Sequence, residues 1–260
     1  MSSSRFSGRV VLITGGGEGI GAAAALRFAA EGASVVIAGR TAATLARTVA
    51  GATEGAAIVA HVADVSDETA VTRAVDEAVD RFGRLDVLVN NAAVYSPGAV
   101  DRLDTTAWRA AVATNLDGVF FASRAALPHL RTTRGNIVNV GSVAAVGGQW
   151  DMPAYSATKA AVANLTRTMA LDHGRAGIRV NVVHPGITHT ETQAPLLALE
   201  QVQAAVRNRV ALGRAGTPDE IAAVIAFLAS EDVAFVTGAQ LMVDGGTSAT
   251  SGNPHVEAPQ

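Results

Sequence analysis

Short apolar runs alternate with longer amphipathic stretches along most of the chain. Seven such runs lie at residues 9–14, 34–39, 56–62, 85–91, 136–142, 178–184 and 239–246. They are largely continuous instead of alternating with polar residues, as is typical of strands covered on both faces. Helical spacing fills residues 19–32, 67–83, 105–130 and 218–231. This order predicts an α/β fold: a Rossmann-type, doubly wound parallel sheet of about seven strands with helices on both faces.

Composition and length restrict the class of protein further. The 260 residues fit one large domain, and a hydrophobic fraction of 49% with only 4% aromatic residues predicts a core of small and branched side chains. A net charge of −3 argues against a nucleic-acid partner, and the absence of cysteine excludes disulfides and zinc–thiolate sites. Neither a membrane-spanning run nor a signal-peptide core is found. We therefore expect a cytoplasmic protein with no membrane partner.

The glycine-rich stretch TGGGEGIG at residues 14–21 lies between the first predicted strand and the first predicted helix. Glycine permits positive φ and close backbone approach, and a helix N-terminus offers unpaired N–H groups to an anion. In a doubly wound sheet such a loop binds the pyrophosphate of a dinucleotide. The spacing predicts this role for the glycines, and cofactor contacts for the loop residues Gly15, Gly17, Glu18, Gly19, Ile20 and Gly21.

Candidate catalytic residues lie in the stretch GSVAAVGGQWDMPAYSATK, which contains Ser142, Tyr155 and Lys159. Residues four apart share one face of a helix, so the ammonium of Lys159 is expected near the phenol of Tyr155. A nearby positive charge favours the phenolate and predicts a lowered pKa for Tyr155. A tyrosine tuned in this way exchanges protons with a carbonyl or alcohol oxygen, to which Ser142 could donate a hydrogen bond.

Taken together, these motifs resemble the short-chain dehydrogenase/reductase family, from about Val10 to Gly246. The resemblance rests on TGGGEGIG, NNA at 90–92, ATNLDGVF around Asn115, Ser142, YSATK at 155–159, VHPG at 183–186 and VDGG at 243–246. It implies a catalytic core of Ser142, Tyr155 and Lys159, with Asn115 holding a water in the proton relay. It also implies cofactor contacts from Tyr155, Lys159, Asp64, Val65, Asn91, Ala92, Ala93, Pro185, Gly186, Thr188 and Thr190.

The family resemblance implies a nicotinamide cofactor, and two residues bear on whether it is NAD or NADP. At the end of the second strand, Gly39 stands where NAD-dependent members tend to have Asp, and Arg40 and Thr41 follow. A guanidinium without a competing carboxylate favours the 2′-phosphate of NADP. Glu18 opposes this, because a glutamate would repel that phosphate or pair with Arg40. We expect NADP to be favoured weakly, NAD to remain possible, and Glu18 to point toward Arg40 or solvent.

One further departure concerns the NNA turn, where Ala93 replaces the glycine that is usual in the family. We expect an ordinary negative φ at Ala93. His184 and His189 flank the VHPG turn and are interpreted as loop histidines that could contact substrate or cofactor. The histidines show no metal-ligand grouping, so no metal site is expected.

The remaining expectations concern substrate, domain and assembly. Tyr95, Ser142, Trp150, Met152 and Tyr155 are predicted to line a pocket for a hydrophobic small-molecule ketone or alcohol. The predicted domain covers residues 1–247, with a substrate lid at about 188–212 that is helical at 195–209, and the tail covers 248–260. A homotetramer is expected, with a dimer as the alternative. The alternative functions are a 3-oxoacyl thioester reductase of the same family and a non-catalytic nucleotide-binding regulator.

Overall fold

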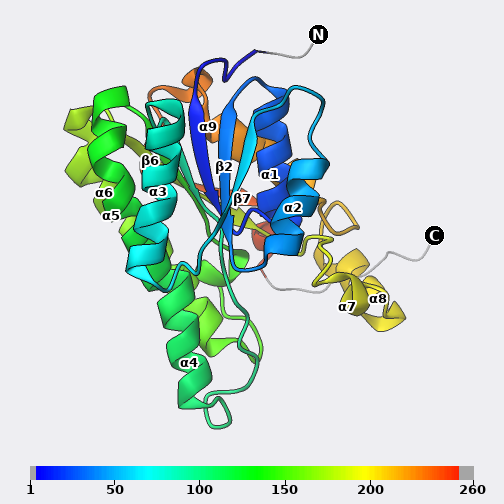
Figure 1. Ribbon diagram of the computed structural model, residues 1–260. Coiled ribbons are helices and arrows are strands. Elements are labelled where there is room, and N and C mark those ends of the chain that lie inside the picture. Colours follow the sequence, from blue (N-terminus) through cyan, green and yellow to red (C-terminus); the bar gives the residue numbers. More distant parts are fainter. Residues whose placement is uncertain (1–3, 252–260) are drawn as a thin grey trace.

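A seven-stranded parallel sheet forms the centre of the computed structural model, which describes residues 4–251 (Figure 1). The strands are β1 Val10–Thr14, β2 Ser34–Gly39, β3 Ile58–Val62, β4 Val87–Asn90, β5 Asn136–Val140, β6 Arg179–Pro185 and β7 Gln240–Val243. Their order in the sheet is β3-β2-β1-β4-β5-β6-β7. Each predicted apolar run coincides with one strand, so the predicted doubly wound sheet is confirmed. The order reverses between β1 and β4, and ligands of such folds bind at this point.

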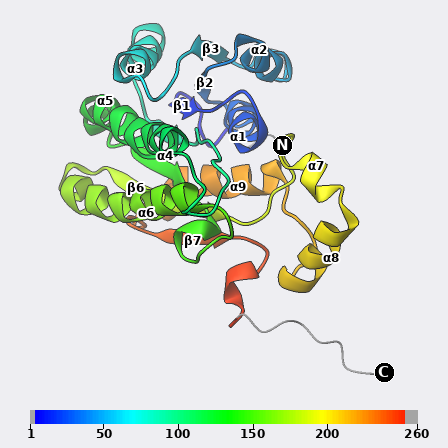
Figure 2. The same ribbon diagram turned by 90° about the horizontal axis from the view of Figure 1, so that it is seen from below.

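Helices cover both faces of this sheet (Figure 2). They are α1 Gly19–Ala30, α2 Ala42–Ala50, α3 Glu68–Phe82, α4 Thr105–Val112, α5 Gly118–Thr133, α6 Pro153–His173, α7 Ala194–Leu197, α8 Glu200–Arg209 and α9 Pro218–Ala229. One core cluster joins the sheet to α1, α2 and α9, and a second joins it to α3, α5 and α6. Alanine occurs in both, because a small side chain lets helices lie close to the strands.

The amino ends of β1 and β4 are tied together by a buried carboxylate. Asp86, directly before β4, accepts a hydrogen bond from the Val10 N–H at 2.9 Å. Its oxygens also pair with the guanidinium groups of Arg9 at 3.0 Å and Arg84 at 2.6 Å. The arginines are partly exposed whereas Asp86 is buried, so the carboxylate is the only fully desolvated member of this cluster.

Two helices that were predicted to be continuous are each divided in two, so the prediction of continuity was wrong for both. The predicted helix 105–130 is divided into α4 and α5 by a π-helical turn, Ala113–Asp117. The predicted helix 195–209 is divided because Leu199 adopts an extended conformation between α7 and α8. This bend lets Leu197 and Val206 pack into one small apolar cluster. A single straight helix would separate the two side chains.

The C-terminal boundary also differs from the expectation of a separate tail that begins at 248. Thr247–Ala249 form a 3₁₀ turn in which Asp244 accepts hydrogen bonds from the Gly246 and Ser248 N–H groups. The first residues of the predicted tail therefore belong to the folded domain. Residues 252–260 of the predicted tail lie outside the described residues.

Candidate active site

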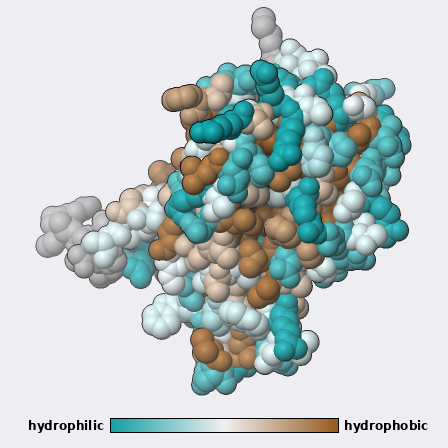
Figure 3. Space-filling view, turned by 90° about the vertical axis from the view of Figure 1, so that its left-hand side faces the viewer, coloured by the Kyte–Doolittle hydropathy of each residue, from teal (hydrophilic) through white to brown (hydrophobic). Residues whose placement is uncertain are grey.

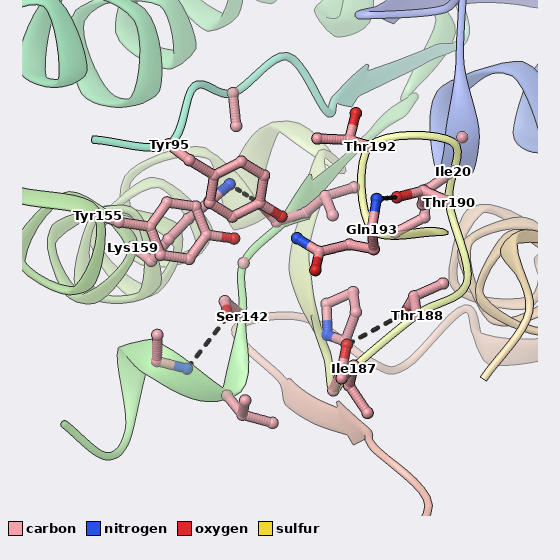
Figure 4. A pocket seen from close by; sticks show the side chains of 18 of the residues that line it. Ile20, Tyr95, Ser142, Tyr155, Lys159, Ile187, Thr188, Thr190, Thr192 and Gln193 are labelled. Carbon is pink, nitrogen blue, oxygen red and sulfur yellow. Dashed lines mark hydrogen bonds between the residues drawn. The ribbon is translucent and has the colours of Figure 1, made fainter. Parts of the chain in front are cut away.

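A cavity of about 1250 Å³ opens at the carboxyl ends of the strands. Its wall is formed by the glycine-rich loop, the ends of β2, β5 and β6, the segment 186–210 and the turn at 247–250. This volume exceeds the roughly 300–1,000 Å³ typical of small-molecule pockets and can hold a dinucleotide and a substrate together. Figure 4 shows side chains from several of these segments converging on one space.

The glycine-rich loop has the geometry of a phosphate cradle. Gly15 and Gly19 have φ values of +67° and +51°, which favour glycine. A Cβ on Gly21 would lie 2.1 Å from the carbonyl oxygen of Gly15, so no larger residue fits there. The Asn91 amide donates to the carbonyl oxygens of Thr14 and Gly15 at 3.0 Å each and holds the loop in place. These residues fit the pyrophosphate of a nicotinamide dinucleotide.

Glu18 and Arg40 both lie at the rim of this cradle and are exposed. Within residues 4–251 Glu18 makes neither a hydrogen bond from its side chain to cap α1 nor an ion pair with Arg40. The Arg40 guanidinium instead interacts electrostatically with Asp64. Two orientations were expected for Glu18, toward Arg40 or toward solvent. The Glu18 side chain is exposed to solvent and does not form an ion pair with Arg40.

Ser142, Tyr155 and Lys159 converge on the cavity from two elements (Figure 4). Tyr155 lies in the first turn of α6, Lys159 lies one turn later, and Ser142 follows β5. The Lys159 Nζ lies 5.6 Å from the centroid of the Tyr155 ring and donates to the Val140 carbonyl oxygen at 2.7 Å. The Ser142 Oγ accepts the Ala144 N–H at 3.1 Å, which leaves the hydroxyl proton free to be donated.

The pKa of Tyr155 departs from the expectation. Burial raises the pKa of the Tyr155 phenol well above its usual value, and Tyr95 raises it further. The Ser142 hydroxyl opposes this rise without cancelling it. Burial also lowers the pKa of Lys159 to about 8. The prediction of a lowered Tyr155 pKa was wrong, because desolvation penalises the phenolate more than the nearby groups stabilise it.

Tyr95 lies directly over Tyr155. The two rings are stacked with their centroids 4.8 Å apart, and Tyr95 is 46% exposed (Figure 4). The backbone before Tyr95 is fixed by Asn115, whose amide accepts the Val94 N–H at 2.8 Å and donates to the Val94 carbonyl oxygen at 3.0 Å. Asn115 is fully buried at the centre of the π-helical turn and does not line the cavity. Such turns occur frequently at functional sites.

Most of the other predicted site residues lie on the cavity wall. They include Gly15, Gly17, Gly19, Ile20, Thr41, Asp64, Val65, Asn91, Ala92, Ala93, Trp150, Pro185, Gly186, Thr188 and Thr190. Ala93 has a negative φ, as expected. Gly21 is buried beneath the loop, and Met152 caps α6, so neither lines the cavity.

Several residues of the wall were not predicted from the sequence. The Glu191 carboxylate accepts the Gly19 N–H at 3.2 Å, at the N-terminus of α1. Gln193 points into the cavity toward the two tyrosines (Figure 4), and Thr247, Ser248 and Thr250 close the wall near β7. Glu191 and Gln193 follow the VHPG turn by a few residues, and this closeness in sequence was the one indication that they could reach the cofactor site. No spacing in the sequence indicates that the 247–250 turn reaches this wall.

His184 differs from the interpretation as a loop histidine. It belongs to β6 and is fully buried, whereas His189 is exposed. Within residues 4–251, no group of histidine and acidic side chains has the arrangement of a metal site. In the same residues no helix combines the length and apolar character that crossing a bilayer requires.

Comparisons with known proteins agree with this geometry. A family model described as enoyl-(acyl carrier protein) reductase matches residues 15–248. The chain is 45% identical to meso-2,3-butanediol dehydrogenase of Serratia marcescens, covering 97% of this chain and 99% of that protein. It is 38% identical to a 3-oxoacyl-(acyl-carrier-protein) reductase of Thermotoga maritima, covering 93% and 98%.

Among solved structures, levodione reductase matches with a TM-score of 0.89 and 35% identity, over 94% of this chain and 99% of that one. These relatives are named as dehydrogenases and reductases, and each is matched over at least 93% of this chain. The chain is an oxidoreductase that acts on secondary alcohols or ketones with a nicotinamide cofactor, and it belongs to the short-chain dehydrogenase/reductase family.

Proposed function

We propose that Tyr155 is the general acid and base of this reaction, and that Ser142 and Lys159 assist it. The observation that carries the proposal is the convergence of these three buried side chains on the cavity beside the glycine-rich cradle. The bound nicotinamide would supply or accept the hydride. The protein then has to hold the substrate oxygen in place and transfer one proton, to that oxygen during carbonyl reduction and from it during alcohol oxidation.

Each side chain has a distinct part in this proton transfer. The phenol of Tyr155 is protonated at neutral pH, because burial raises its pKa, and it can donate to a carbonyl oxygen. Ser142 can donate a second hydrogen bond to the same oxygen, because its Oγ already accepts the Ala144 N–H. The Lys159 ammonium would stabilise the phenolate that remains and would bind the ribose hydroxyls of the cofactor.

Asn115 would contribute by holding the water of the proton relay. Two contacts support this indirectly. The Asn115 amide bonds Val94, the residue before Tyr95, and it donates to the Thr158 hydroxyl on α6 at 3.3 Å. The same contacts fix the segment that carries Tyr95 over the phenol of Tyr155.

The cofactor would occupy the cradle and the adjacent ends of the strands. Gly15 to Gly21 would surround the pyrophosphate, Asp64 and Val65 the adenine, and Asn91 to Ala93 the centre of the dinucleotide. Pro185, Gly186, Thr188 and Thr190 would flank the nicotinamide. We propose weak selectivity for NADP over NAD, which is supported by Arg40 being exposed at the rim and not paired with Glu18.

For the substrate, we propose a hydrophobic small-molecule ketone or secondary alcohol. The wall beside Tyr155 carries mostly apolar side chains, among them Val143, Val146, Trp150, Leu196 and Val202. The named activity of the Serratia relative on a small diol supports this choice. A thioester on an acyl carrier protein would need a basic docking surface, but Arg214, just after the lid, is engaged by Glu220 at 2.6 Å.

We also propose that the chain is cytoplasmic and assembles as a homotetramer. Figure 3 shows apolar side chains gathered on one face of the molecule, and Phe120 of α5 and Leu171 of α6 are exposed. An apolar surface between two helices is suited to pairing with the same surface of a second copy.

The decisive experiment compares Tyr155→Phe with the natural chain. We expect kcat to fall by about 10²–10⁴-fold in both directions, because the proton is no longer transferred by a positioned group. Cofactor affinity, measured by quenching of Trp fluorescence, should change little. A screen of ketones, alcohols and thioesters with both cofactors identifies the substrate class, and retained turnover in Tyr155→Phe would contradict the mechanism.

A further inference from the structure

His184 is a buried histidine beside Ser142 that has no part in the proposed proton transfer. It is 0% exposed and does not line the cavity. Its Nδ1 lies 3.2 Å from the backbone nitrogen of Ser142 and 2.9 Å from the carbonyl oxygen of the same residue. One ring nitrogen therefore faces both backbone polar groups of a proposed catalytic residue.

The strand pairing explains why a side chain bonds the backbone at this point. The Gly141 N–H donates to the Val183 carbonyl oxygen at 2.7 Å and continues the pairing of β5 with β6. Pro185 has no N–H with which to extend the ladder. At Ser142 the imidazole of His184 replaces the missing strand hydrogen bond and accepts the backbone N–H. A Cβ on Gly141 would lie 2.5 Å from the His184 Nδ1. Only glycine at 141 leaves room for the ring.

The far side of the ring is fixed as well. The Gln240 Oε1 on β7 lies 2.9 Å from the His184 Nε2, and the Gln240 Nε2 donates to the Ala163 carbonyl oxygen on α6 at 3.0 Å. Because the Gln240 amide nitrogen is used by Ala163, its oxygen faces the ring, and the His184 Nε2 must be the donor. In this tautomer Nδ1 accepts the Ser142 N–H at 3.2 Å, and its 2.9 Å approach to the Ser142 carbonyl oxygen is a contact and not a hydrogen bond.

The Nδ1 side of the His184 ring bonds the backbone of Ser142, whose hydroxyl is one of the proposed reacting groups. The Ser142 Oγ accepts the Ala144 N–H at 3.1 Å, so rotation of the Ser142 backbone would also redirect its hydroxyl. That hydroxyl and the Tyr155 phenol lie on the same cavity wall, and the Ser142 side chain lowers the pKa of Tyr155. Hydrogen bonds thus connect Ala163 through Gln240 and His184 to the backbone of Ser142.

We propose that His184, oriented by Gln240, is a positioning residue that fixes the backbone of Ser142 and thereby aims its hydroxyl at the substrate oxygen. This inference rests on the proposed role of Ser142. His184 contacts neither the cavity nor a reacting atom, so it acts only through Ser142. Its loss should reduce kcat, while the affinity for the cofactor should stay unchanged.

Two substitutions at His184 separate positioning from packing. In His184→Asn the side-chain amide reproduces the position of Nδ1 and can still bond Ser142, whereas in His184→Gln it reproduces Nε2 and bonds only Gln240. Both remove the ring. We expect His184→Asn to retain most of kcat and His184→Gln to lose roughly 10- to 100-fold, the size of effect that misplacing a reacting group by about 1 Å can produce. Equal losses of kcat and Tm in both variants would overturn the inference.

A double-substitution experiment tests whether the effect passes through Ser142. In a Ser142→Ala background, His184→Gln should cause no further fall in kcat, since no hydroxyl remains to be aimed. The same fold-loss in both backgrounds would contradict the inference. His173→Gln, a half-buried histidine outside the cavity wall, is the matched control with unchanged kcat. Full turnover in Ser142→Ala alone would instead contradict the proposed function.

Discussion

At the scale of single residues, the protonation of Tyr155 would decide which direction the proposed mechanism favours. Burial raises the pKa of the phenol, and the proposed acid would then be ready for carbonyl reduction at neutral pH. Alcohol oxidation needs the phenolate, whose fraction grows tenfold for each pH unit below the pKa. The positive charge of Lys159, with a pKa of about 8, supports the phenolate only below that pH.

We therefore expect the two directions to depend differently on pH. The kcat/KM for alcohol oxidation should rise between about pH 6 and 8, and carbonyl reduction should stay level there, because its acid is present throughout. Above about pH 8, where Lys159 loses its charge, the rise in oxidation should become less steep. Initial rates in both directions across this range measure the effect. An oxidation rate already constant at pH 7 would contradict the raised pKa of Tyr155.

A second prediction concerns the choice of cofactor. Arg40→Ala should lower kcat/KM for NADP by about 10- to 100-fold, since a charge-assisted contact contributes roughly 1.5–3 kcal/mol. The value for NAD should be little changed. Glu18→Gln should act in the opposite direction and raise kcat/KM for NADP, because it removes a negative charge at the rim of the cradle. Steady-state kinetics with both cofactors decide this, and equal effects of Arg40→Ala on both would refute it.

The positions of the candidate site residues could be predicted from the sequence only where a motif fixes the geometry. Ser142, Tyr155 and Lys159 were predicted and do converge, because their spacing places them at a strand end and on one turn of a helix. The sign of the Tyr155 pKa shift was not predicted correctly, since sequence spacing contains no information on burial. His184 was interpreted as part of a loop, and its contacts depend on β7, which lies 56 residues away along the chain from it.

At the scale of elements, the segment between β6 and α9 closes the cavity over the cradle. Its Glu191 carboxylate lies against the Gly19 N–H, where a pyrophosphate oxygen of the cofactor would bind. A negative charge near a helix N-terminus is stabilised by about 0.3–1 kcal/mol, so cofactor binding has to overcome a contact of this size.

Replacing this carboxylate should tighten cofactor binding. We expect Glu191→Gln to lower the Kd of the nicotinamide cofactor by about two- to fivefold, the equivalent of 0.3–1 kcal/mol. Fluorescence titration with the reduced cofactor measures the change. Glu200→Gln, at the exposed start of α8, should leave the Kd unchanged as the control. A weaker affinity in Glu191→Gln would show that the carboxylate assists binding.

The tie between β1 and β4 leads to a prediction about stability alone. Asp86→Ala should lower the free energy of unfolding by about 2–4 kcal/mol, because it leaves the buried Val10 N–H without an acceptor and removes the Asp86 ion pairs of both arginines. Arg84→Ala should cost less than about 1 kcal/mol, since its guanidinium is 43% exposed. Urea unfolding measures both. Because Asp86 lies at the amino ends of the strands, kcat should be unaffected, and a loss of kcat in folded Asp86→Ala would contradict this separation.

All seven strands could be predicted from hydrophobic runs, because buried parallel strands have few polar residues. The breaks within helices could not. The π-helical turn at Ala113–Asp117 and the bend at Leu199 contain neither proline nor glycine, and both are accompanied by side-chain contacts that hydrophobic spacing does not reveal. Asn115 bonds Val94, and Leu197 packs with Val206, and neither pairing has a local signal.

At the scale of the whole molecule, the apolar face of α5 and α6 predicts the assembly. Leu171→Glu together with Phe120→Glu should convert the proposed tetramer into a smaller species, because the charges would be buried on association. Sedimentation velocity measures the size. Val100→Glu, at a loop position as exposed as Leu171, is the control that should keep the assembly unchanged. An unaltered tetramer in the double variant would place the interface elsewhere.

The two ends of the described chain lie at different distances from the cavity. The N-terminal segment enters β1 from the amino end of the sheet, opposite the cavity (Figure 1), whereas Thr247, Ser248 and Thr250 form part of the cavity wall. The consequence is practical. An affinity tag or a fusion partner attached before residue 4 should leave kcat unchanged, while one joined directly after Ser251 would lie next to the cavity wall and should lower kcat/KM. For immobilising the enzyme on a surface, attachment through the N-terminus keeps the active site facing the solution.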